Sequence, residues 1–146
     1  MLNKLVILAM VAFGFSVMAQ DESAVQALEG YDPVAYFTKG EAVRGDGFIL
    51  SKHEGLTYLF SSKENKELFD KNASKYVPQF GGWCAFGASV GKKFHADPNA
   101  FVIHNDKLYV NVNADILKKF KEDLDGNIKK ALNNWMKIKN KPADSL

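Results

Sequence analysis

The chain has 146 residues, of which 47% are hydrophobic, 12% aromatic and 25% charged. This length and composition are typical of one globular domain and exclude a chain that is disordered throughout. The formal net charge is only +2, so we expect no nucleic-acid partner, because dedicated nucleic-acid binders carry a strong basic field.

Residues 1–19 have the pattern of a secretory signal peptide. Lys4 supplies a positive start, an uncharged apolar run follows, and Val17-Met18-Ala19 fits a cleavage site. The apolar run is shorter than the ~20 residues of a membrane span. We therefore expect cleavage after Ala19, a short N-terminal lead over residues 20–28, and a mature protein without a stable membrane span. The protein is expected to be exported to the periplasm, with secretion as the alternative.

The first part of the mature chain predicts a turn and a hairpin. Asp32-Pro33 is typical of the entry into a turn or a short helix. Two apolar segments, residues 48–50 and 56–60, flank Glu54-Gly55 and predict an antiparallel β-hairpin.

A helix is predicted directly after this hairpin. Ser62 is the expected N-cap, the helix ends near Lys71, and Leu68 and Phe69 give it a buried edge. Residues 76–82 contain proline and glycine and therefore predict an irregular connection.

A second helix and hairpin are predicted after the connection. Residues 83–90 predict a short buried helix that ends at Gly91. Residues 100–104 and 108–112, joined by a turn at Asn105-Asp106, predict a second hairpin.

The last helical region begins after Asn113, the expected cap, and runs to about Lys139, with a break at Asp125-Gly126. Its apolar residues recur at spacings of three and four, which indicates an amphipathic helix. Residues 140–146 form a polar tail. The order of elements predicts an α+β fold, a compact single domain of antiparallel β-hairpins packed against helices, with a long C-terminal amphipathic helical region.

The tetrapeptide pattern Asp-Pro-x-Ala occurs twice, at residues 32–35 and 97–100. Because Asp-Pro frequently starts turns, we interpret the two copies as independent turn starts rather than as a repeat. The sequence shows no regular repeat period of the solenoid kind.

Cys84 is the only cysteine of the chain, so no intramolecular disulfide can form. A thiolate at the start of the predicted helix would be stabilised by the helix dipole, and it could bind a soft metal such as Cu(I) or react with an oxidant. The alternative is packing, because Cys84 shares a small-residue face with Gly87, Ala88 and Gly91, and free cysteines are commonly buried.

Other candidate site residues are histidines and aromatic residues. His53 and His95 are the candidate metal ligands besides Cys84, and only the fold could bring them to it. The aromatic candidates for a ligand pocket or a contact face are Tyr31, Tyr36, Phe80 and Trp83, with the protein core as the alternative. No hydrolase or calcium-loop motif occurs, so no catalytic residue is predicted and nothing compels an enzyme.

Six motifs occur in order, at Gly30–Phe37, Gly55–Asn65, Phe69–Tyr76, Pro78–Ala85, Asp97-Pro98 and Lys107–Asn111. Together they resemble the YHS domain family, and the later motifs resemble its longer, exported branch. The resemblance implies a YHS-like domain over residues 29–139. In short YHS domains, cysteines thought to bind metal occupy three positions that here hold Ala35, Ser61 and Asn65. These residues are poor ligands for soft metals, so we do not expect that site in this chain.

Three functions follow from these observations. The first is an exported binding module that handles a heavy metal, a copper ion, through Cys84 with His53 or His95. The alternative is a module that binds a small ligand or a protein, with Cys84 buried as packing. The third is a thiol-based redox sensor or enzyme, and binding is expected ahead of catalysis.

Overall fold

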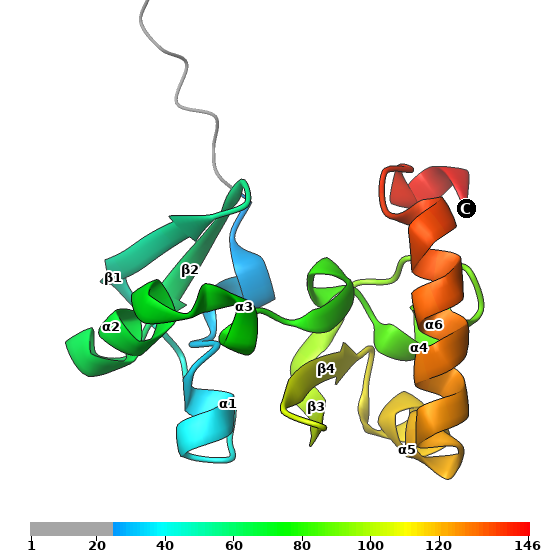
Figure 1. The fold of residues 1–146 in the computed structure, drawn as a ribbon, viewed down its shortest axis with the longest axis horizontal. Coiled ribbons are helices and arrows are strands. Elements are labelled where there is room, and N and C mark those ends of the chain that lie inside the picture. The colour runs from blue at the N-terminus through cyan, green and yellow to red at the C-terminus, as the bar shows by residue number, and fades with distance from the viewer. Residues whose placement is uncertain (1–24) are drawn as a thin grey trace, which may run out of the picture.

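The structure is a computed structural model that describes residues 25–146, so the predicted signal peptide lies outside the described residues. Helices and two small antiparallel sheets confirm the α+β fold (Figure 1). Within residues 25–146, none of the helices has the length and apolar character needed to cross a membrane.

The described chain consists of a first half (residues 25–76) and a second half (residues 77–146). The first half contains a 3-10 turn η1 (Ala27–Gly30), α1 (Ala35–Thr38), β1 (Asp46–His53), β2 (Leu56–Phe60), α2 (Lys63–Lys71) and α3 (Ala73–Tyr76). The second half contains a 3-10 turn η2 (Gln79–Gly82), α4 (Ala85–Ser89), β3 (Asp97–His104), β4 (Lys107–Asn111), α5 (Ala114–Glu122), α6 (Leu124–Ile138) and η3 (Ala143–Ser145). Figure 1 shows the halves side by side, with α6 at the edge of the second half that faces away from the first half.

The two halves repeat one topology. In the first hairpin Asp46 pairs with Phe60 and His53 with Leu56; in the second, Asp97 pairs with Asn111 and His104 with Lys107. Each residue named in the second hairpin lies 51 positions after its counterpart in the first. The register shift lies between residues 46 and 50 in the first hairpin and between residues 97 and 101 in the second, which is again a spacing of 51. Helices α2 and α5 follow at the same spacing, each capped by a side chain that accepts a backbone N–H three residues on (Ser62 and Asn113).

The turns η1 and η2 are also equivalent, at a spacing of 52 residues. Leu28 and Glu29 have φ values of 51° and 52°, and their counterparts Phe80 and Gly81 have 57° and 61°. Each turn ends at a glycine with positive φ, a conformation that residues with a Cβ rarely adopt. Three pairs of residues with this backbone thus line up between the halves: Leu28 with Phe80, Glu29 with Gly81, and Gly30 with Gly82.

This internal repeat agrees with the interpretation that the two Asp-Pro segments are independent turn starts. Asp32 corresponds to Cys84 and Asp97 to Asp46, so the two Asp-Pro segments are not equivalent to each other. From residue 46 to 76 the halves share the same residue type only at the pairs Asp46/Asp97, His53/His104, Tyr58/Tyr109 and Phe69/Phe120. So few identities give no visible period, and only the fold shows the repeat.

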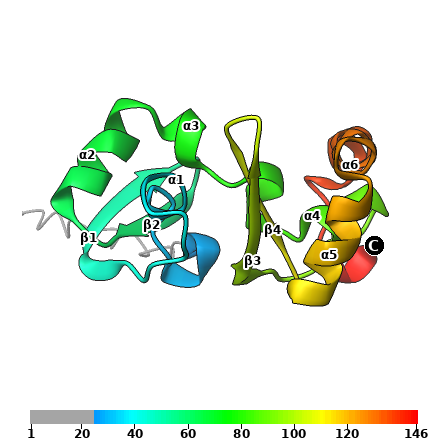
Figure 2. The ribbon, with the colours of Figure 1, turned by 90° about the horizontal axis from the view of Figure 1, so that it is seen from below.

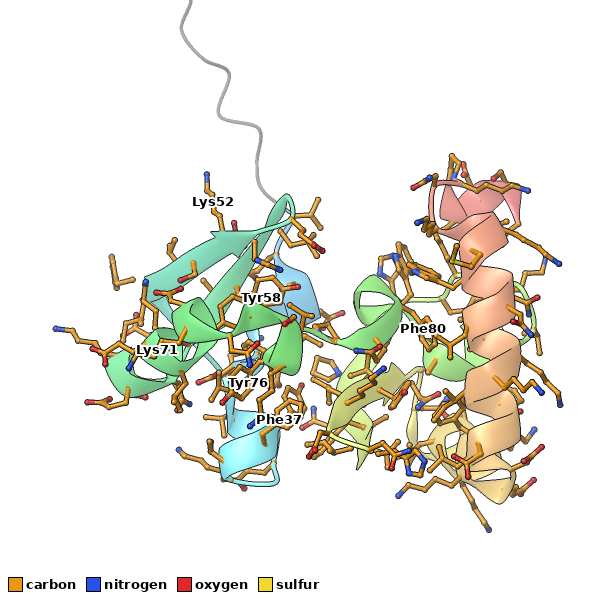
Figure 3. The ribbon with its side chains drawn as sticks, viewed as in Figure 1. Phe37, Lys52, Tyr58, Lys71, Tyr76 and Phe80 are labelled. Carbon is orange, nitrogen blue, oxygen red and sulfur yellow. The ribbon has the colours of Figure 1, made fainter. Side chains whose placement is uncertain are left out.

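Each half has its own core, and each core contains an equivalent pair of aromatic side chains. Tyr58 packs on Phe69 with ring centroids 4.8 Å apart, and Tyr109 packs on Phe120 at 5.9 Å. In Figure 3, Tyr58 lies within the first half and Phe80 lies beside α6 in the second.

A third cluster joins the halves. Leu28 and Tyr36 of the first half pack against Leu108 and Val110 of the second. The Tyr36 hydroxyl also donates to the carbonyl of Pro98 at 2.9 Å. As a result the hairpin β3–β4 stands between the first half and the helices α4 to α6 (Figure 2).

Two details of the predicted helices were wrong. Leu68, expected on the buried edge of α2, is 40% exposed, whereas Phe69 is fully buried. The last helical region breaks at Asp123 rather than at Asp125-Gly126, because the Asp123 side chain accepts from the backbone N–H of Gly126 and starts α6 there.

The buried tyrosines predict a loss of stability in alkali. Burial raises the pKa of Tyr58 to about 12 and raises the pKa of Tyr36 as well. Because the unfolded tyrosine ionises near 10, folding stability is unaffected below pH 10 and falls as the pH rises toward 12. Tyr58→Phe should remove about 1 kcal/mol of the loss between pH 8 and pH 11 in urea unfolding. An unchanged pH dependence in the variant would contradict this assignment.

Candidate functional site

Cys84 is fully buried and lies at the N-cap of α4. The backbone N–H of Gly87 donates to its sulfur at 3.3 Å, and Sγ lies 3.7 Å from Oδ1 of Asn111. The same Oδ1 accepts from the backbone N–H of Phe86 at 3.1 Å. The thiol is therefore part of the packing that starts α4.

This burial predicts how the thiol reacts. We expect a disulfide reagent to label Cys84 at least about 100-fold more slowly in the native protein than in denaturant, because labelling requires local opening. The measurement is the absorbance of the released thiolate with and without urea. Native labelling as fast as denatured labelling would show that the thiol is accessible.

The structure places the two candidate histidines apart. His53 ends β1 in the first half, where its Nε2 lies 3.9 Å from Oε1 of Glu54. His95 lies in the second half, with its ring centroid 4.9 Å from that of Trp83. Among residues 25–146, no group of three or more His, Cys, Asp or Glu side chains is arranged to hold a metal ion.

The carboxylate of Asp32 is buried and surrounded by hydrogen-bond donors. Val34 and Ala35 donate backbone N–H groups to Oδ1 of Asp32 at 2.9 and 3.3 Å. Oδ2 accepts from the backbone N–H and hydroxyl of Ser61 and from Nδ2 of Asn65, at 2.7 to 2.8 Å. Ala35, Ser61 and Asn65, the three positions that the resemblance singled out, all donate to Asp32. Both carboxylate oxygens therefore already have hydrogen-bond donors.

In the second half, a different residue accepts the equivalent backbone N–H group at the start of the helix. Cys84 takes the place of Asp32 and leaves the start of α4 without a carboxylate, and the amide of Asn111 accepts from Phe86 as Asp32 accepts from Val34. The Nδ2 atom of Asn111 has no hydrogen-bond partner in the described part of the chain. Sequence reasoning treated Asp32 only as a turn start, because its partners Ser61 and Asn65 come from a distant segment.

The aromatic candidates divide into core residues and half-buried residues. Tyr36 and Phe80 are buried in the core, which was the alternative to a ligand pocket or a contact face. Tyr31 and Trp83, which are equivalent, are half-buried, and each carries a side chain against its ring. These are Arg44 on Tyr31, with Cζ 5.1 Å from the ring centroid, and His95 on Trp83.

A cavity of about 160 Å³ lies between the halves. The first half lines it with residues 25–29 and Leu56. The second half lines it with Gly81, Gly82, Trp83, His95, Ala96, Pro98 and Val110. The wall of the cavity is mostly apolar or glycine. Its polar side chains are the indole of Trp83, the imidazole of His95, the carboxylate of Glu29 and the amide of Gln26.

Lys93 fixes the indole wall of this cavity. Its Nζ lies 5.7 Å from the ring centroid of Trp83 and 5.4 Å from that of Trp135. It also donates to the carbonyls of Lys139 and Lys141 at 2.8 and 2.6 Å, at the C-terminal end of α6. A cation at this helix end is favourable, and it ties Trp83 to α6. No local pattern in the sequence pointed to the contacts with α6, because Trp135, Lys139 and Lys141 lie more than forty residues away.

Comparison of the chain with protein-family models, with curated proteins and with solved structures finds no match.

Proposed function

We propose that the protein is an exported, YHS-like binding module that takes a small organic ligand into the cavity between its halves. The observation that carries this proposal is the cavity itself, with Trp83 and His95 on one side and Glu29 on the other. Ligand sites in proteins are concave, mostly apolar and supplied with a few placed polar groups, and this cavity has that composition.

The size of the cavity limits the ligand. An apolar cavity of about 150 Å³ is known to accept benzene, so 160 Å³ suits a ligand of about one ring or one short branched chain. A peptide or a nucleotide exceeds this volume and would be surrounded there only in part.

The backbone around the cavity supports a binding role as well. Leu28, Glu29 and Phe80 have a left-handed backbone, which costs about 1 to 2 kcal/mol for each residue with a side chain. Strained backbone of this kind is typical of ligand clamps. Here it brings Leu28 and Glu29 of one turn, and Gly81 of the other, to the cavity wall.

The proposal is tested with a fragment library observed by NMR on the mature protein. We expect fragments of one-ring size to shift the signals of Trp83 and His95, and Trp83→Leu to weaken their binding about tenfold or more. Tyr31→Leu is the matched control, because Tyr31 is the equivalent aromatic residue and does not line the cavity. If no fragment shifts these signals, or if both variants act alike, the proposal is wrong.

Copper handling through Cys84 makes a different prediction. The test is a Cu(I) titration of the reduced protein against a competing chelator, with Cys84→Ser in parallel. Our proposal predicts equal competition by both proteins, since Cys84 serves packing. Tight binding that disappears in Cys84→Ser would instead support metal handling.

A further inference from the structure

The internal repeat allows each wall of the cavity to be compared with its counterpart in the first half. There, Arg44 lies with Cζ 5.1 Å from the ring centroid of Tyr31, and its Nη1 donates to the carbonyl of Glu29 at 2.9 Å. A guanidinium ion thus lies against an aromatic ring and is held by a carbonyl of the left-handed turn. Both contacts are favourable for a planar cation.

In the second half His95 takes the place of this arginine, and the cation near the ring is the ammonium group of Lys93, with Nζ 5.7 Å from the centroid of Trp83. Trp83 corresponds to Tyr31, Gly81 to Glu29 and His95 to Arg44, and all three second-half residues line the cavity. The imidazole of His95 is shorter than an arginine side chain, and within the described chain it makes no hydrogen bond to the carbonyl of Gly81. The cavity is therefore lined by Gly81 and Trp83, the counterparts of the two residues whose carbonyl and ring hold the guanidinium of Arg44 in the first half.

The charges around the cavity agree with a cationic ligand. Glu29 contributes a carboxylate to the wall, and no lysine or arginine among residues 25–146 lines the cavity. Lys93 lies near Trp83 but is held at the end of α6 by two carbonyls and is not part of the wall. A cation in the cavity thus faces one carboxylate.

We propose, resting on the proposed function, that the ligand carries a guanidinium or amidinium group. This group donates to the carbonyl of Gly81, lies beside the Trp83–His95 wall and is attracted by Glu29. Arg44 shows within the same chain how such a group is bound. The ligand class is therefore a small organic molecule with a planar, delocalised cation.

The probes are methylguanidinium, and N-methylurea as a neutral molecule of similar shape. We expect methylguanidinium to shift the NMR signals of Gly81 and Trp83, and N-methylurea to bind at least about tenfold more weakly. Glu29→Gln should weaken methylguanidinium binding up to about fivefold, which is the range of an exposed ion pair.

His95→Arg provides an independent test, because it restores in the second half the residue found in the first. Its guanidinium should occupy the place of the ligand and abolish methylguanidinium binding, while the far-UV circular dichroism stays unchanged. His104→Arg is the matched control, since His104 lies on β3 and outside the cavity wall.

The results separate this inference from the proposed function. Equal binding of methylguanidinium and N-methylurea, or full binding in a folded His95→Arg variant, would overturn the cationic ligand. If neutral one-ring fragments still bind at Trp83 in that case, the cavity remains a ligand site of another class. If neither cations nor fragments bind there, both proposals fail.

Discussion

Asp32→Asn should destabilise the protein by about 3 to 5 kcal/mol, although it changes only one atom of a side chain. The carboxylate accepts hydrogen bonds on both oxygens and is fully buried. An amide turns one of these oxygens into a donor, which then faces other donors such as Ser61 and Asn65. Each buried donor left without an acceptor costs about 1 to 3 kcal/mol.

The measurement is the free energy of unfolding in urea, and Asp46→Asn is the matched control. Asp46 is exposed and accepts one hydrogen bond, from the backbone N–H of Phe48 at 2.9 Å, so its replacement should change stability by no more than about 0.5 kcal/mol. Equal effects of the two substitutions would show that the buried network contributes little.

Phe69→Ala and Phe120→Ala should each cost about 3 to 5 kcal/mol, because both remove a buried ring and leave a cavity. The two residues are equivalent in the repeat and both are fully buried against a tyrosine. Unfolding in urea measures the effect. Leu68→Ala is the control, since Leu68 is 40% exposed and should lose less than about 1 kcal/mol. A small effect at only one of the two phenylalanines would mean that the cores are not equivalent.

Local chemistry made much of the fold predictable from the sequence. Glu54-Gly55 and Asn105-Asp106 marked the hairpin turns, and Ser62 and Asn113 marked helix starts, because turn and cap residues act over three or four positions. The structure confirms these elements. Leu68 was misplaced because neighbouring apolar residues on a short helix do not reveal which of them faces the core.

The candidate site was predictable only in part. Trp83 and His95 were identified from the sequence, but as members of different sets, one aromatic and one metal-binding. Glu29 gave no signal, and Gly81 was noted only as part of an irregular connection. Their place at the cavity depends on a left-handed backbone at both turns and on the docking of the two halves. Such contacts between distant segments leave no periodicity in a single sequence.

The separate cores of the two halves also have a consequence for dynamics. Since each hairpin packs its own aromatic pair, the chain divides into two cooperative units that meet at Leu28, Tyr36, Leu108 and Val110. Local opening of native proteins occurs in such cooperative units. A parting of the halves would expose the side chains of this junction while leaving the backbone pairing of both hairpins intact, because each hairpin lies within one half. A molecule held at this junction would stabilise the closed arrangement without touching either core, to an extent set by its occupancy.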